Sequence, residues 1–343
     1  MSPYLDRIKP WVSVICTCYN HEAYVEEALQ SVVRQDYPNV ELVVIDNGST
    51  DCSAARIARF AQTHPAVRFV ANPTNLGLNR AFNQGLRLTA GRYVIDLSAD
   101  DMLLPHRIRR QVEQFEALRG PYAVVFSNAG FIDQQSRPIG HHYAVDANGR
   151  ARQPVPSGDV FLDVLRGYFI STPTMMMRRD VLLELGGYDE ALAYEDFDFW
   201  VRSARLYRYA YHDEVLTLKR RLPDSLSAQV IRRDNPLLES SLVVCYKAFD
   251  RCTEPAEYRA LAGRVRQFIR KAFYAEQFGL VLRFGTLLSQ LDEMNQSDRP
   301  RFDATTRIIL VLSRLQMPIN GLYRRYRRWF APRRLIATPA SVA

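Results

Sequence analysis

The last 40 residues of the chain contain no acidic residue, and this absence locates the charge of the whole protein. The 343 residues include 45 Lys and Arg against 37 Asp and Glu, a net charge of +8. Beyond Asp303 there is no Asp, Glu or Lys, and the only charged residues are Arg307, Arg314, Arg324, Arg325, Arg327, Arg328, Arg333 and Arg334. The other 37 basic residues equal the acidic ones, so the body is neutral. A nucleic-acid-binding core would carry basic residues throughout its fold, so nucleic acid is not an expected partner and the tail stands apart.

The chain also lacks a long apolar run. The longest unbroken aliphatic stretch is Ile308–Leu312, whereas a membrane-spanning helix needs about 20 apolar residues. The first ten residues include Asp6 and Lys9 and contain no apolar segment of the secretory type. We therefore expect a cytoplasmic protein that does not cross a bilayer.

Five cysteines are an odd number, which disfavours a disulfide framework. Cys16 and Cys18 fall in one apparent strand, and Cys245 and Cys252 fall in one apparent helix. Neither spacing is that of a metal site. We expect reduced and mostly buried thiols.

The first hundred residues alternate apolar strands with amphipathic helices. The pattern predicts strands at 11–19, 40–45, 67–70 and 93–97. It predicts a helix that follows Asn20 and ends near Tyr37 and Pro38, and further helices at 49–60 and 78–88. Asn20, Ser49 or Thr50, and Pro105 are the expected helix starts. Near-continuous apolar strands separated by helices are typical of a parallel sheet covered on both faces. The predicted class is α/β, with a mostly parallel central sheet flanked by helices and an almost wholly helical chain after about residue 234.

Polar side chains stand where the expected strands end, and in such sheets ligands bind beyond the carboxyl ends of the strands. Thr17 and Tyr19 close the first strand, Asp46 the second, and Asp100 and Asp101 follow the fourth. No P-loop and no Gly-x-Gly-x-x-Gly follows the first strand, which disfavours an ordinary ATPase or dinucleotide site. Asp46 could accept hydrogen bonds from a base or a ribose, and Tyr19 could pack on a flat ring.

The adjacent carboxylates Asp100 and Asp101 would repel each other in a cleft. A hard divalent cation, shared with substrate phosphates, removes this repulsion, so a metal-bridged nucleotide diphosphate fits the pair. On the pair alone, a loop and helix N-cap ahead of residues 102–110 is an equally open interpretation.

Five segments occur in a fixed order along the chain: Val12–Asn20, Val44–Asp51, Asn75–Gly77, Ser98–Asp101 and Tyr194–Asp198. Together they resemble the motif series of family 2 glycosyltransferases of the GT-A fold, over residues 10–230. The resemblance implies a Rossmann-like nucleotide-binding half. It also implies inverting transfer of a sugar from a nucleotide-diphosphate sugar, with a UDP-sugar expected, to an acceptor hydroxyl.

The resemblance implies roles for residues on the donor side. Thr17, Tyr19 and Asp46 would hold the nucleotide base, with Asp46 reading its polar edge. Asp100 would contact the ribose or the metal. Asp101 would be the direct ligand of Mg²⁺ or Mn²⁺ on the diphosphate, where the cation would neutralise charge on the leaving group.

Further roles follow on the acceptor side and at the phosphates. Asp196 would be the general base that takes the proton from the acceptor hydroxyl. Its neighbour Glu195 lies beside the acceptor, although only one of the two carboxylates should face it. Trp200 could stack on an acceptor sugar or belong to the core. Arg80 is a candidate contact of the donor phosphates, although Phe82 stands where the family often has a basic residue.

The chain departs from the family pattern at three places. Ser98 stands where the metal motif usually begins with a carboxylate, and Asn47 where a second acidic residue is common. Leu222 stands where the family often has a histidine, and leucine cannot ligate a metal. Arg220 or Arg221 would meet the diphosphate instead. Because of these departures, an alternative remains open in which the protein is a partner that binds nucleotide sugars but is weak in catalysis.

Residues 1–233 form the expected catalytic domain, 234–303 a helical extension and 304–343 a basic amphipathic tail. The extension would pack on the catalytic domain or on a second subunit, which leaves a homo-oligomer open. In the tail, one helical face would hold Leu322, Tyr326, Trp329 and Phe330 beside arginines, the composition of an interfacial membrane anchor. The alternative is a helix docked on the body with a solvated arginine face.

The leading hypothesis is a metal-dependent glycosyltransferase, peripheral on the inner face of the cell membrane. It would extend a lipid-linked surface glycan of the O-antigen, capsule or exopolysaccharide kind. A nucleotidyltransferase is the alternative enzyme, because it would use the same metal site but would have no use for Asp196.

Overall fold

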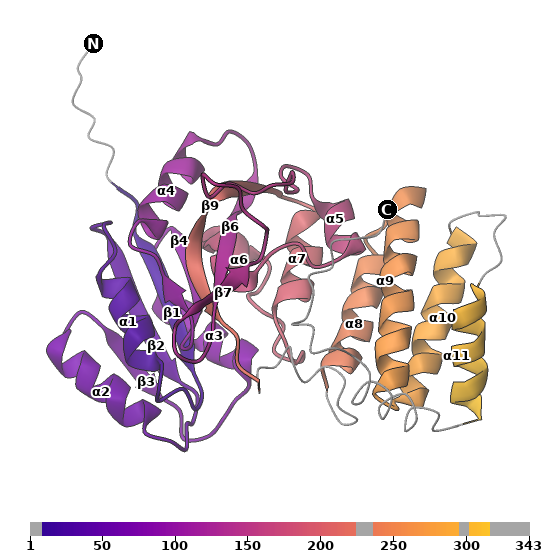
Figure 1. Ribbon diagram of the computed structural model, residues 1–343, viewed down its shortest axis with the longest axis horizontal. Coiled ribbons are helices and arrows are strands. Elements are labelled where there is room, and N and C mark those ends of the chain that lie inside the picture. The colour runs from indigo at the N-terminus through magenta and orange to yellow at the C-terminus, as the bar shows by residue number, and fades with distance from the viewer. Residues whose placement is uncertain (1–8, 224–235, 295–301, 316–343) are drawn as a thin grey trace, which may run out of the picture. The chain divides into compact units, whose positions relative to one another are not determined.

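The computed structural model describes residues 9–223, 236–294 and 302–315 (Figure 1). The chain divides into two compact units, Met1–Leu222 and Pro223–Ala343. The expected boundary between residues 233 and 234 lies in the segment 224–235, outside the described residues.

The first unit begins with a parallel half-sheet in the order β3-β2-β1-β4. The strands are β1 (Val12–Cys18), β2 (Val40–Asp46), β3 (Arg68–Ala71) and β4 (Tyr93–Ser98). The helices between them are α1 (Val25–Val33), α2 (Ser53–Thr63) and α3 (Leu78–Leu88). This arrangement confirms the predicted parallel sheet of alternating strands and helices.

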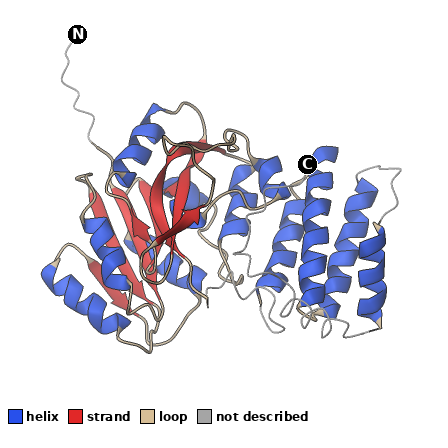
Figure 2. Ribbon diagram, in the orientation of Figure 1, coloured by secondary structure: helices blue, strands red, loops and turns tan. Residues whose placement is uncertain are grey.

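The second half of the same sheet mixes parallel and antiparallel pairs (Figure 2). Its strands are β5 (Met102–Leu103), β6 (Tyr122–Ile132), β7 (Pro138–His141), β8 (Met176–Arg178) and β9 (Arg208–Arg220). Strand β8 joins β4 to β6 by antiparallel pairs, and the long β6 and β9 run parallel. The accompanying helices are α4 (Arg107–Ala117), α5 (Phe161–Arg166), η1 (Thr172–Thr174), α6 (Arg179–Glu184) and α7 (Asp196–Ala204).

Strand β1 is buried along its whole length because helices cover both faces of the sheet. Its alternate residues Val12, Val14 and Cys16 pack with α1 and α2 in the larger core cluster. On the other face α3 comes very close, since a Cβ on Gly85 would lie 2.5 Å from Ile15 Cγ2. Of the five cysteines, which are all free thiols, four are buried, as expected.

The predicted helix starts were wrong. Helices α1, α2 and α4 begin at Val25, Ser53 and Arg107. Asn20 instead has a left-handed conformation, with φ of 57°, and its Oδ1 accepts a hydrogen bond from Thr50 N at 2.8 Å. Polar residues that could cap a helix connect two loops, and this tertiary pairing overrides the local capping preference.

The second unit is helical, with α8 (Leu237–Phe249), α9 (Pro255–Tyr274), α10 (Phe278–Met294) and α11 (Ala304–Arg314). Helix α9 begins with a capping box formed by Glu254 and Glu257. Helix α11 packs on α9 and α10, so the tail predicted for 304–343 begins as part of this bundle, while residues 316–343 lie outside the described residues. Within the described residues, no helix is both long and apolar enough to span a bilayer.

Candidate functional site

Three strand ends meet at one edge of the sheet. Strand β1 pairs in parallel with β2 on one side and with β4 on the other. The register places Thr17 opposite Ile45 and Ser98, and Cys18 opposite Asp46. The carboxyl ends that the sequence predicted to converge therefore lie side by side, with Thr17 and Asp46 buried and Tyr19 43% exposed.

Asp46 presents a buried carboxylate oxygen that has no hydrogen-bond partner among the described residues. Its other oxygen, Oδ2, accepts a hydrogen bond from Ser49 N at 3.1 Å, and the residue is 2% exposed. A buried acceptor without a partner costs about 1–3 kcal/mol. The site thus suits a ligand that brings an N–H or O–H donor to Asp46.

Hydrogen bonds connect the two loops that follow β1 and β2, beside Asp46. Asn20 N donates to Ser49 Oγ at 3.0 Å, Glu22 N donates to Asp51 Oδ2 at 3.0 Å, and Cys52 N donates to Glu22 Oε2 at 2.8 Å. Each loop supplies both donors and acceptors, so each holds the other in place. These two loops beside Asp46 are therefore held in place by their own contacts, without a ligand.

Asn47, which replaces a common acidic residue, connects the end of β2 to the start of α3. Its Oδ1 accepts from Leu76 N at 3.0 Å, and its Nδ2 donates to Asn75 Oδ1 at 3.0 Å and to Gly77 O at 3.3 Å. A carboxylate could not make the two donations. The amide of Asn47 therefore has a structural role, because it holds the start of α3 against the end of β2.

The carboxylates after β4 lie in two different environments. Asp101 is buried, and its Oδ1 accepts from Arg220 N at 2.8 Å. Asp100 accepts from Ser98 Oγ at 2.6 Å, so the residue that replaces the first family carboxylate orients the second. His21, to which the sequence assigned no role, places Nδ1 4.0 Å from Asp100 Oδ1.

Burial, and next the charge of Asp100, raise the pKa of Asp101 to about 8. Lys219 and Arg220 oppose the shift with their positive charges. A carboxyl group that loses this much hydration becomes ionised more readily when a cation lies beside it. The pair is thus electrostatically suited to a cation.

The protein by itself supplies only part of the ligands that Mg²⁺ or Mn²⁺ needs. Across residues 9–223, 236–294 and 302–315, no group of three or more His, Cys, Asp or Glu is arranged to hold an ion. Asp100 and Asp101 would be the protein ligands, and water and a bound diphosphate would complete the shell. Magnesium sites commonly combine one or two carboxylates with substrate phosphates in this way.

Arg220 does not face a ligand, contrary to the expectation for it. Its side chain is fully buried. Nε donates to Asp100 O at 3.0 Å, Nη1 to Asp133 O at 2.8 Å, and Nη2 to Glu27 Oε2 at 2.7 Å. These contacts make Arg220 a structural connection beneath the carboxylates. Arg221 is exposed and lies over the Phe131 ring, 3.9 Å from its centroid.

Glu195 and Asp196 form the start of α7, where Glu195 is the N-cap residue. Asp196 Oδ2 accepts a hydrogen bond from Thr172 Oγ1 at 3.1 Å. Burial, then Asp196, then Asp96 raise the pKa of Glu195 well above its ordinary value. Asp96, buried on β4, also has its pKa raised by burial, to about 7. The negative charge of Asp96 thus acts on Glu195. Asp196 differs from Glu195 in that it accepts a hydrogen bond from Thr172.

Trp200 lies in the core, and this corrects its assignment to the acceptor side. It is 0% exposed, and its Nε1 donates to Met175 Sδ at 3.1 Å. The ring of Tyr168, which is 38% exposed, meets the edge of Trp200 with centroids 5.8 Å apart. Tyr168 is therefore the exposed aromatic residue beside α7 that the sequence did not single out.

Two cations complete the site. Arg80, the predicted phosphate contact, is 58% exposed and pairs with Glu190 Oε2 at 3.6 Å. Lys219 on β9 lowers the pKa values of both Asp101 and Glu195. It belongs to no motif, so the sequence did not single it out.

Comparison with known proteins identifies relatives of one kind. A family model described as "Glycosyl transferase family 2" matches residues 13–186. An uncharacterized glycosyltransferase of Haemophilus influenzae is 29% identical over 233 residues, 66% of this chain and 69% of that protein. One from Methanocaldococcus jannaschii is 28% identical over 223 residues, 63% of this chain and 72% of that protein.

Solved structures share the fold at low sequence identity. S. aureus TarS 1–349, in complex with UDP-GlcNAc, matches with a TM-score of 0.65 and 18% identity, covering 92% of each chain. Mannosyltransferase PcManGT from Pyrobaculum calidifontis, in complex with GDP-Man and Mn²⁺, matches with a TM-score of 0.53 and 18% identity. That alignment covers 95% of this chain and 89% of the other. The fold is that of GT-A glycosyltransferases.

Proposed function

The chain belongs to glycosyl transferase family 2, and we propose that it is an inverting transferase that moves a sugar from a nucleotide-diphosphate donor, first of all a UDP-sugar, to an acceptor hydroxyl. The observation that carries this proposal is the edge of the sheet where β1, β2 and β4 end side by side. Asp46 has a buried Oδ1 without a partner among the described residues at this edge, and the carboxylates Asp100 and Asp101 follow β4. A nucleotide diphosphate brings a hydrogen-bond donor for Asp46 and phosphates for a cation held after β4.

On the donor side, Asp46 would accept a hydrogen bond from the base through its unpartnered Oδ1. Tyr19, exposed beside it, would pack on the ring. Asp100 and Asp101 would hold Mg²⁺ or Mn²⁺, which when bound supplies positive charge to the diphosphate. Lys219 would face the same diphosphate and favour its departure.

On the acceptor side, Asp196 would act as the general base. The acceptor oxygen forms a bond to the anomeric carbon, its proton passes to Asp196, and the carbon–oxygen bond to the diphosphate breaks with its electron pair on the leaving group. Thr172 Oγ1 fixes one carboxylate oxygen of Asp196. General-base assistance is worth about 10²- to 10⁴-fold in rate.

We further propose that the acceptor is a lipid-linked glycan and that the protein binds the inner membrane face peripherally. Helix α11 supports this proposal, because Ile308, Val311 and Leu315 are 59%, 53% and 63% exposed. Arg307 and Arg314 are exposed as well. Apolar side chains beside cations suit a surface of anionic lipid. The aromatic part of the predicted anchor, including Trp329, lies outside the described residues.

A panel of nucleotide sugars tests the activity. The purified protein is incubated with UDP-, GDP-, CDP- and dTDP-sugars, with and without Mn²⁺, and the released nucleotide is identified. Release of a nucleoside diphosphate together with free or transferred sugar supports the proposal. Release of pyrophosphate from a sugar phosphate and a nucleoside triphosphate would replace it with nucleotidyl transfer, and binding without turnover would replace it with a donor-binding partner.

A further inference from the structure

The segment that carries the proposed base has no regular secondary structure of its own. It runs from the end of α6 to Glu195, and Gly186 and Gly187 in it have φ of 76° and 75°. Buried carbonyls in irregular backbone need donors from elsewhere, since no helix or strand partner is available. The position of Asp196 therefore depends on the side chains that bind this segment, called here the base loop (residues 186–195).

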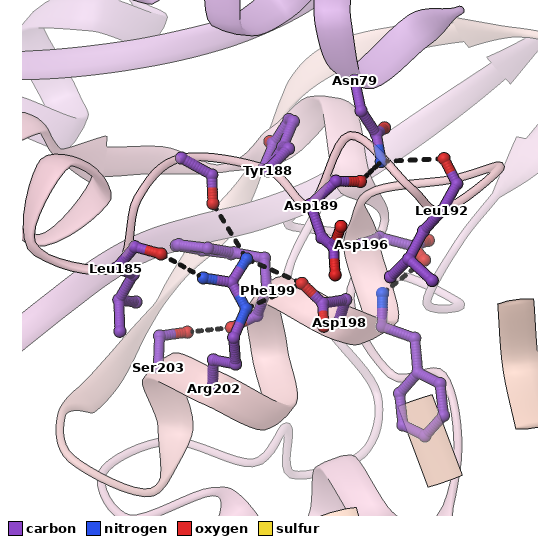
Figure 3. Close-up of polar contacts among 12 residues, drawn as sticks. Asn79, Leu185, Tyr188, Asp189, Leu192, Asp196, Asp198, Phe199, Arg202 and Ser203 are labelled. Atoms are coloured by element: carbon purple, nitrogen blue, oxygen red, sulfur yellow. Dashed lines mark hydrogen bonds and ion pairs between the residues drawn. The ribbon is translucent and has the colours of Figure 1, made fainter. Parts of the chain in front are cut away.

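Asn79 on α3 binds the base loop at three places, and Figure 3 shows two of them, at Asp189 and Leu192. Its Nδ2 lies 2.6 Å from Asp189 O, 3.2 Å from Leu192 O and 3.3 Å from Tyr194 O. The third of these carbonyls is two residues before Asp196. Asn79 is 2% exposed, and its Oδ1 is buried without a partner among the described residues. One amide group thus shares its two N–H donors among three carbonyls of the loop.

Asn83, one turn later on α3, binds the beginning of the same loop. Its Nδ2 donates to Tyr188 O at 2.8 Å, and its Oδ1 accepts from Tyr188 N at 2.9 Å. The fit is tight, because a Cβ on Gly187 would lie 2.5 Å from Asn83 Oδ1. Helix α3 therefore contacts the base loop along its length.

Helix α7 holds the loop from the other side. Arg202 Nη1 donates to Leu185 O at 2.7 Å, Nη2 donates to Gly187 O at 2.9 Å, and Nε donates to Asp198 Oδ2 at 2.7 Å. These contacts are visible around the Arg202 guanidinium in Figure 3. They fix the beginning of the loop to α7, whereas the end of the loop, next to Asp196, is bound by Asn79.

We propose that Asn79 is a positioning residue for the general base. It determines the position of Asp196 by holding the backbone of residues 189–194 against α3. The same helix is bound at its start by Asn47, beside the nucleotide pocket. One rigid helix thereby fixes the distance between the donor pocket and the base. This inference rests on the proposed function, because it gives Asn79 a task only if Asp196 takes the acceptor proton.

The test variant is Asn79→Leu, which keeps the shape of the side chain and removes its donors. A displacement of the base by about 1 Å can cost on the order of 10²-fold in rate. We expect kcat to fall by about 10- to 100-fold, while the Kd of UDP, or of GDP where a GDP-sugar turns over faster, stays within about twofold. Asn79→Ser, which keeps one donor, should lie between Leu and the wild type, and it replaces Leu in every assay if the Leu variant does not fold.

Asn128→Leu is the matched control. Asn128 is also buried, and its Nδ2 and Oδ1 bind the backbone of Tyr143 at 2.8 and 2.9 Å. Its loss should lower stability to a similar degree and leave kcat within about threefold. Equal losses of kcat in the two variants would show that Asn79 acts through general stability and would overturn the proposal.

A double-mutant cycle separates positioning from other effects. If Asn79 acts through Asp196, then adding Asn79→Leu to Asp196→Asn should lower the residual donor turnover by less than about twofold. Multiplication of the two losses would overturn the proposal. If Asp196→Asn alone retains full turnover, the proposed function fails first. Amide hydrogen exchange gives a readout without turnover: in Asn79→Leu it should quicken within residues 188–196, and unchanged exchange there would also contradict the inference.

Discussion

Replacing Asp46 by asparagine should change which base the pocket prefers. In the wild type, Oδ2 accepts from Ser49 N at 3.1 Å and Oδ1 remains for the ligand. Asparagine has one acceptor and one donor group. If its oxygen keeps the Ser49 contact, its NH₂ group points to where a uracil N3–H would donate, and two donors then face each other.

The size of the effect follows from the lost contact. A hydrogen bond to a charged group is worth about 1.5–3 kcal/mol, and every 1.4 kcal/mol is tenfold in Kd. Asp46→Asn should therefore weaken UDP by about 10- to 150-fold. The affinity for CDP should fall much less, because cytosine N3 accepts a hydrogen bond and can pair with the new NH₂ group.

Isothermal titration with UDP and CDP measures both values. Asp180→Asn, at a surface carboxylate that pairs with Arg178, controls for the loss of one negative charge. Unfolding curves establish that both variants remain folded. An unchanged UDP/CDP ratio in Asp46→Asn, with UDP still bound as in the wild type, would refute the assignment of Asp46 to the base.

Three further predictions concern the metal site, the tail and a buried acid. Asp101→Ala should abolish the Mn²⁺-dependent part of nucleotide binding, and if EDTA leaves wild-type binding unchanged, the metal assignment is wrong. Removal of residues 316–343, beyond α11, should weaken binding to anionic vesicles at least about 100-fold, since each arginine near such a surface contributes roughly 1 kcal/mol. Full retention on the vesicles would rule out the anchor. Burial raises the pKa of Asp96 to about 7, so its neutral form is favoured in the fold and its contribution to stability is lost as pH rises from about 4 to 7. Asp96→Asn should flatten this decline, whose slope is at most about 1.4 kcal/mol per pH unit for one proton; an equal slope in denaturant titrations of both proteins would contradict it.

The sequence predicted those parts of the site that follow from regular structure. Thr17 and Asp46 could be placed together because parallel strands end at one edge of a sheet, and the register confirms it. The order of the motifs predicted the family. The helix starts predicted at Asn20 and at Ser49 or Thr50 were wrong, because these residues bind each other across two loops instead of capping a helix.

Contacts between residues that are close in the fold but distant in the sequence could not be predicted in the same way. Lys219 stands in no motif, and Asn79 meets the base loop across 110 residues of sequence. Trp200 shows a related difficulty, since a helix with apolar residues on several faces does not reveal which of them reaches solvent. The exposed aromatic residue beside α7 proved to be Tyr168 instead.

The most direct test of the account is donor and acceptor turnover by Asp196→Asn, measured beside its affinity for UDP. The carboxylate of Asp196 is proposed to take the acceptor proton, and the amide cannot. The account predicts a loss of about 10²- to 10⁴-fold in kcat, with the Kd of UDP unchanged within about twofold. Turnover at the wild-type rate, with a folded protein and normal UDP binding, would contradict the account.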